Sequence, residues 1–190
     1  MLKLGPEAPT LNEGWKVLDL AAHLVAREHD IWAAGGIVWG GPFAAVLEMA
    51  MNRRRRQGLK ELVAKLRRGE PLWWRPVPRG AQLTEYYIHH EDIRRPNGLR
   101  PRTDRPDLDQ KLGRLVAASA PIMLRRVETG VELRWNGDLL HEHGPEPRAV
   151  LEGPPGELLL YLSGRRSPAQ VDLGGDATAA AALSSAELGT

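Results

Sequence analysis

Three residues of types that bind metal ions stand at spacings that could bring them together: His23, Glu85 and His89. Glu85 and His89 are four positions apart, so on a helix they would lie on one face, one turn from each other. A histidine from a second helix, His23, would then supply a third ligand. Three protein ligands with one open position are typical of a reactive metal site, whereas structural zinc sites have four ligands.

Two further residues fit such a site. On a helical wheel Asp92 shares the face of Glu85 and His89. Its carboxylate would there accept a hydrogen bond from the non-coordinating nitrogen of a ligating imidazole. Arg27 follows His23 by one helical turn and would bind an anionic substrate such as a carboxylate.

These residues also have ordinary interpretations, which the pattern leaves open. Pairs of the form Glu-x-x-x-His arise by chance in many proteins. His23 falls in a polar stripe opposite Leu20 and Leu24, as on the solvated face of a helix. The other members of that stripe are Lys16, Asp19, Arg27 and Asp30. His90 points away from the Glu85 face and is interpreted as a packing or surface histidine.

Two other clusters are weaker candidates. His141 and His143 would face one side of a strand, as a metal pair or, more commonly, as part of a polar strand face. Arginines 53–56 form a basic run. No aromatic residues are interleaved with that run and the formal net charge is only +2, so a solvated helix face is favoured over a nucleic-acid site.

Composition bounds the class of protein. The chain has 190 residues, of which 42% are hydrophobic, enough for a sizeable core in one large or two small domains. Cysteine is absent, which excludes disulfides, iron–sulfur clusters and thiolate zinc sites. The first residues lack the apolar core of a signal peptide, and no apolar run is long enough to span a bilayer. We therefore expect a cytoplasmic protein without a membrane partner.

Hydrophobic periodicity predicts helices in the first two thirds of the chain. They cover residues 15–39, 43–68 with an interruption near Gly58, 81–95 and 106–127, and Thr10 or Asn12 would cap the first. From Gly130 the period changes to that of strands, predicted at residues 131–135, 139–143, 148–152 and 170–173. Asn136-Gly137 predicts a hairpin turn. Short helices are expected at 157–163 and, capped by Asp176, up to residue 186.

The change of period predicts an α-helical domain over residues 1–128 and a small α+β domain over residues 129–190. Two stretches of the first domain, GPEAPTLNEGWKVLDLAAHLVARE (5–28) and TEYYIHHEDIRRPNG (84–98), resemble the DinB-like metal-binding family related to the mycothiol-dependent maleylpyruvate isomerase. The stretch PPGELLLYLSGRRSPAQVDLGGDATAAAAL (154–183) is similar to the sterol-carrier-like α+β tail of such proteins.

The resemblance implies a four-helix DinB-like bundle in which His23, Glu85 and His89 hold a divalent ion, usually zinc. It also implies a low-molecular-weight thiol such as mycothiol as co-substrate, beside an anionic substrate, in a transferase or isomerase reaction. A Lewis acid can keep a thiol ionised near neutral pH. Because this chain has no cysteine, the reacting sulfur would arrive with the co-substrate.

Two departures qualify the resemblance. Relatives usually carry a further helix before the GPEAPT-like segment, where this chain has only MLKL. A bundle with its first helix truncated would expose apolar surface or need a partner, for example in a homo-oligomer, unless the start is misassigned. The branch resembled is also not the isomerase itself, so fold and site are better supported than the reaction. The alternative function is a non-catalytic ligand-binding or interaction module whose tail binds a small apolar molecule.

Overall fold

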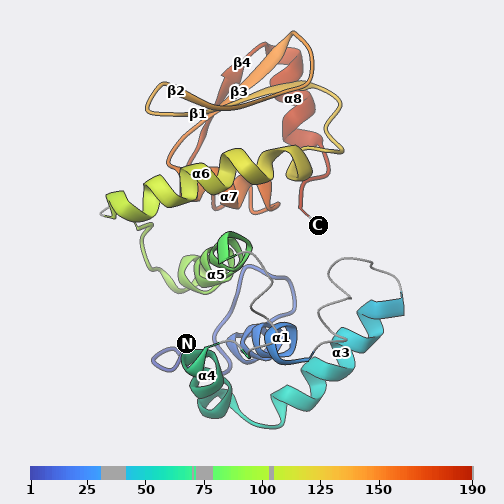
Figure 1. The fold of residues 1–190 in the computed structure, drawn as a ribbon, viewed down its shortest axis with the longest axis vertical. Coiled ribbons are helices and arrows are strands. Elements are labelled where there is room, and N and C mark those ends of the chain that lie inside the picture. The colour runs from blue at the N-terminus through green and yellow to red at the C-terminus, as the bar shows by residue number, and fades with distance from the viewer. Residues whose placement is uncertain (31–41, 70, 72–78, 103–104, 190) are drawn as a thin grey trace. The chain divides into compact units, whose positions relative to one another are not determined.

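The computed structural model describes residues 1–30, 42–69, 71, 79–102 and 105–189. A helical N-terminal region is followed by an α+β C-terminal region, as predicted (Figure 1). The chain forms two compact units. Unit 1 comprises Met1–Arg79 and His89–Pro101, and unit 2 comprises Gly80–Ile88 and Arg102–Thr190. These units divide the chain elsewhere than the predicted domains 1–128 and 129–190, which remain a prediction because compactness alone does not test independent folding.

Unit 1 is built from helices α1 (Val17–His29), α3 (Pro42–Arg55) and α4 (Leu59–Arg68) and from the C-terminal part of α5 (Arg79–Arg94). A short 3-10 helix, Arg95–Asn97, ends α5. The predicted break near Gly58 is confirmed, and Gly58 precedes α4 with φ at 78°, a backbone conformation that favours glycine. The core of the unit consists of buried apolar residues from α1, α3, α4 and α5, among them Leu20, Val25, Met51, Leu62 and Ile93.

The predicted cap of the first helix is wrong. Thr10 and Asn12 lie before α1, which begins only at Val17. The hydroxyl of Thr10 donates a hydrogen bond to the carbonyl of Trp15 at 2.9 Å, and the N–H of Lys16 donates to Asp19 at 2.8 Å. The expected continuation of this helix to residue 39 lies outside the described residues.

Helix α3 covers part of the polar stripe of α1. Arg54 donates two hydrogen bonds to Asp30, at 3.0 and 2.8 Å, and Arg55 donates to Asp19 at 2.6 Å. Two arginines of the 53–56 run thus make ion pairs inside unit 1, while Arg53 and Arg56 are exposed. The stripe is therefore an interhelical contact over much of its length rather than a solvated face.

His29, the last residue of α1, is half-buried beside cations from two other helices. Its Nε2 is buried and has no hydrogen-bond partner in the described ranges. Burial, followed by the charges of Arg54 on α3 and Lys65 on α4, lowers the pKa of His29 from its ordinary value of 6.5, against a smaller opposing effect of Asp30.

The lowered pKa predicts acid sensitivity. The unfolded chain takes up a proton at His29 at a higher pH than the folded chain does. The stabilisation is therefore complete above the ordinary pKa of 6.5 and is lost as the pH falls through the folded-state pKa. We expect His29→Gln to flatten the fall in unfolding free energy between neutral pH and about pH 5, measured by urea titration. The exposed control His90→Gln should leave the fall unchanged, and equal slopes in wild type and His29→Gln would contradict the assignment.

Unit 2 contains a four-stranded sheet with the strand order β2-β1-β3-β4. The strands are β1 (Gly130–Trp135), β2 (Asp138–His143), β3 (Arg148–Glu152) and β4 (Asp172–Gly175). Strands β1 and β3 are parallel, and the two outer pairings are antiparallel. Helices α6 (Pro106–Met123), α7 (Pro155–Leu162) and α8 (Ala177–Ser185) complete the unit together with the first part of α5 (Figure 1).

One hydrophobic core holds unit 2 together. Alternate residues of β1 and β3, namely Val131, Leu133, Ala149 and Leu151, are buried together with residues of α5, α6, α7 and α8. The other face of these strands carries charged and half-buried residues such as Glu132 and Arg134, which pair at 2.7 Å. This alternation explains why the sequence period of two marked the strands.

Several predicted elements are confirmed and some boundaries differ. The hairpin at Asn136-Gly137 is present, with positive φ at both residues. Asp176 caps α8 by accepting hydrogen bonds from the N–H groups of Thr178 and Ala179. Strand β4 begins two residues later than predicted, and α6 ends at Met123 rather than at residue 127. Across the described ranges, no helix has the length and apolar character needed to cross a membrane.

Candidate metal centre

The segment before α1 folds back along the start of that helix. Val17 donates a backbone hydrogen bond to Ala8, and Leu18 donates to Pro6, both at 3.0 Å. Pro9 and Lys16 form an isolated antiparallel bridge. These bonds fix the turn that carries Trp15, whose indole lies 5.2 Å from the imidazole of His23, centre to centre.

The same segment is attached to α5. The N–H of Leu11 donates to the carbonyl of Asp92 at 2.9 Å. Asn97 donates from its side chain to the carbonyl of Pro9 at 2.9 Å and to that of Ile93 at 2.7 Å. The sequence marked the Pro-Asn-Gly after α5 only as a helix end, but Asn97 also ties that end to the segment preceding α1.

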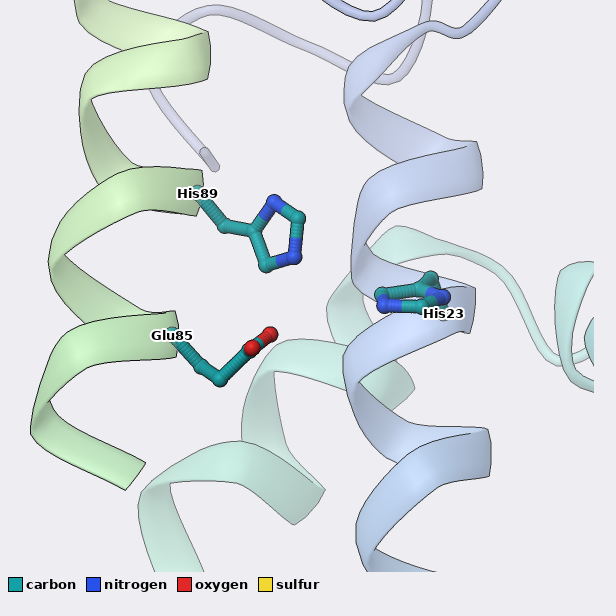
Figure 2. Close-up of side chains that lie close together, drawn as sticks. All are labelled: His23, Glu85 and His89. Atoms are coloured by element: carbon teal, nitrogen blue, oxygen red, sulfur yellow. The ribbon is translucent and has the colours of Figure 1, made fainter. Parts of the chain in front are cut away.

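His23, Glu85 and His89 come together in the structure. One potential ligand atom from each side chain lies within 4.8 Å of the others, and they form the only group of three or more His, Asp or Glu side chains at metal-binding separations among the described residues. Figure 2 shows Glu85 and His89 one turn apart on α5, both directed toward His23 on α1. His23 and His89 both belong to unit 1, and the continuous helix α5 fixes Glu85 relative to His89.

A buried carboxylate orients His89. Nδ1 of His89 lies 2.9 Å from Oδ2 of Asp92, which has no exposed surface. Because a carboxylate only accepts, this contact assigns the proton of His89 to Nδ1 and leaves Nε2 with a lone pair for a cation. The predicted role of Asp92 thus has the geometry that it requires, since carboxylate–imidazole pairs fix the tautomer of metal ligands.

The donor set suits zinc with a small closure. Zinc–nitrogen and zinc–oxygen bonds near 2.0–2.2 Å place tetrahedral ligand atoms roughly 3.4 Å apart. The ligand atoms here lie within 4.8 Å, so side-chain rotations of about an ångström would be enough. The rings of His23 and His89 already meet edge to face, with centroids 5.2 Å apart. Two imidazoles and one carboxylate are a usual zinc ligand set with an open position.

We expect Asp92→Asn to weaken zinc binding by about 10- to 100-fold, because a neutral amide supports the imidazole of His89 less well than a carboxylate does. A competition titration with a chromogenic chelator measures the affinity. Asp30→Asn is the matched control, since it removes a carboxylate that pairs with Arg54 instead of a histidine. Unchanged affinity in Asp92→Asn would show that His89 does not bind the metal through the tautomer assigned here.

The other sequence candidates lie outside this cluster. Arg27 is half-buried one turn beyond His23 on α1, and His90 is exposed. On β2, His141 and His143 pair with Leu133 and Val131 of β1 and share the face of these apolar residues. Nε2 of His143 lies 3.0 Å from the carbonyl of Val127, to which it donates, and no third ligand-type side chain joins this pair in the described part of the chain.

Two residues beside the cluster were not singled out from the sequence. Trp15 contacts His23. Gln82 precedes Glu85 by one turn on α5, is only 8% exposed, and its Nε2 has no hydrogen-bond partner in the ranges described. Positions 82, 85 and 89 share a helix face, so the wheel that joined Glu85 to His89 and Asp92 could have included Gln82. Trp15 had no such signal, because it lies before the helix.

Comparisons of this chain with protein-family models, with curated proteins and with solved structures find no match.

Proposed function

We propose that this chain is a divalent-metal-binding protein of the DinB-like type, with His23, Glu85 and His89 as zinc ligands. The observation that carries the proposal is the convergence of these three side chains from α1 and α5 within 4.8 Å. The hydrogen bond from His89 to the buried Asp92 supports it, because it prepares Nε2 for a cation. The two signature-like stretches of the sequence, residues 5–28 and 84–98, contain all four residues.

We propose further that the protein is an enzyme that transfers or isomerises with a small thiol, of the mycothiol type, as co-substrate. Bound zinc supplies a Lewis acid that would hold a sulfur as thiolate near neutral pH. Asp92 keeps the proton of His89 on Nδ1, away from the ligand atom. Arg27, one turn from His23, would attract the anionic substrate. A four-helix bundle around this site and a cytoplasmic location are part of the same proposal.

Thermal unfolding with and without metal tests the thiol. The zinc-loaded protein should be stabilised further by a small thiol such as N-acetylcysteine, and chelation should remove that increment. At about 100 times the dissociation constant a ligand adds about 2.7 kcal/mol, or roughly 5–10 °C for a chain of this size. The oxygen analogue N-acetylserine is the matched control. Equal effects of thiol and alcohol, or of thiol before and after chelation, would contradict thiol binding at zinc. Stabilisation by fatty acids or sterols alone would favour the apolar-ligand module.

A further inference from the structure

Unit 2 carries a cavity that is separate from the proposed metal ligands. Its volume is about 450 Å³, and residues at the start of α6, at the end of β1 and just before α7 line it. Cavities of roughly 300–1,000 Å³ accommodate small-molecule ligands. All lining residues belong to unit 2, from Arg102 to Pro154, so the cavity is a property of that unit alone.

A rigid apolar wall forms one part of the cavity. Trp135 ends β1 immediately before the Asn136-Gly137 turn and is paired with Asp138 of β2. A Cβ atom placed on Gly113 of α6 would lie 3.5 Å from the indole, so glycine at this helical position allows close contact between α6 and Trp135. The backbone pairing and this contact hold the ring, which is half-buried and lines the cavity together with Pro106 and Pro154.

A positive charge is held at the same cavity. Arg102 lines it, and the guanidinium carbon of Arg102 lies 4.7 Å from the ring centre of Tyr87. Tyr87 is only 5% exposed, and its hydroxyl occupies the space that a Cβ on Gly156 would fill. The cation–π contact therefore rests on a well-packed ring, which limits the freedom of the guanidinium.

A negative charge faces the same space. Asp109, in the first turn of α6, is half-buried and lines the cavity. Burial raises the pKa of its carboxyl, and no cation of the described residues pairs with it. Arg102 and Asp109 thus line one cavity of unit 2 without forming an ion pair with each other. Opposite charges kept apart on the wall of a cavity leave both available to a ligand that carries the complementary pair.

We propose that this cavity binds a small zwitterion with a flat apolar group, of the aromatic α-amino-acid class. Arg102 would bind the carboxylate, Asp109 the ammonium group, and Trp135 the ring of the ligand. The side-chain amide of Asn136, which is exposed at the rim, adds a hydrogen-bonding group. The site does not depend on a metal ion.

Isothermal titration with L-phenylalanine tests the proposal, using 3-phenylpropionate and 2-phenylethylamine as probes that each lack one charge. Phenylalanine should bind with saturation, and both analogues should bind at least about tenfold more weakly. Arg102→Gln and Asp109→Asn should each weaken phenylalanine by a similar factor. The matched controls are Arg105→Gln and Asp107→Asn, which alter exposed neighbours that do not line the cavity.

Three outcomes would overturn the proposal. These are no saturable binding of phenylalanine at millimolar concentration, an analogue that binds as tightly as phenylalanine, and binding that neither Arg102→Gln nor Asp109→Asn changes. Circular dichroism of each variant establishes that it is folded before titration. Because no metal is involved, the same titration after chelation should give the same affinity, which separates this site from the proposed zinc centre.

Discussion

Zinc binding is expected to fall by more than about 100-fold when His89 is replaced by alanine, since loss of a direct ligand costs more than loss of its hydrogen-bond partner. His89 is 8% exposed, contacts the ring of His23 and is oriented by Asp92. Its removal leaves one imidazole and one carboxylate, too few to retain zinc against a chelator. Metal analysis after gel filtration, together with the zinc-induced rise in melting temperature, measures the effect.

The neighbouring histidine provides the control. His90 is exposed and adjacent in sequence, and it lies outside the cluster. His90→Ala should therefore retain the stoichiometry and the affinity of the wild type. If wild type and His89→Ala contain the same amount of zinc, the three-ligand assignment is wrong. Loss of zinc in both variants to the same extent would show that the metal is bound elsewhere on α5.

Replacing Glu91 with alanine is expected to lower the free energy of unfolding by about 3–5 kcal/mol. The Glu91 carboxylate has no exposed surface and contacts Nε of Arg95 at 2.7 Å and Nε of Arg94 at 3.1 Å. Arg95 is itself largely buried, with 8% of its side chain exposed. Alanine at position 91 would leave that guanidinium buried without this carboxylate, which is costly. Urea unfolding monitored by circular dichroism measures the change.

An exposed pair of the same spacing is the matched control. Glu61 and Lys65 on α4 are also four residues apart and approach to 3.3 Å, but 52% of the Glu61 side chain is exposed. Exposed pairs of this kind contribute about 0.3–0.5 kcal/mol, so Glu61→Ala should differ little from wild type. A loss below about 1 kcal/mol in Glu91→Ala would mean that the buried pair contributes no more than a surface one.

Local signals in the sequence predicted the elements that depend on a few neighbouring residues. Asn136-Gly137 requires positive φ at both positions and specified the hairpin. Asp176 predicted the start of α8 because a side chain that accepts two backbone hydrogen bonds is a purely local cap. Strand β3 matches its predicted limits, since its alternating burial is directly visible in the sequence.

Tertiary contacts decided the rest. Strand β4 is exposed along its length, so no burial pattern marked its register, and it is placed by pairing with β3. The start of α1 depends on hydrogen bonds of Val17 and Leu18 to Ala8 and Pro6, which hydrophobic periodicity does not encode. Likewise, α6 stops at Met123, although apolar residues continue to Val127.

The candidate site shows the same division. One helix places Glu85, His89 and Asp92 on a face, so spacing alone predicted their proximity. His23 lies on another helix, and its stripe mates Asp19 and Asp30 contact arginines of α3 instead. The wheel could not distinguish a histidine that faces α5 from a solvated one, because the polar stripe looked uniform. Only the resemblance of residues 5–28 pointed to His23 specifically.

Asp92 uses its two ends for two attachments: its carboxylate holds the ring of His89, and its carbonyl accepts the N–H of Leu11. A shift of this one residue would disturb both partners at once. Thermodynamic reciprocity then links them, so that whatever steadies the imidazole also steadies the strand-like leader before α1, by an equal free energy in each direction. The amino-terminal arm is in this sense a lever on the ion's affinity, although it contributes no ligand of its own.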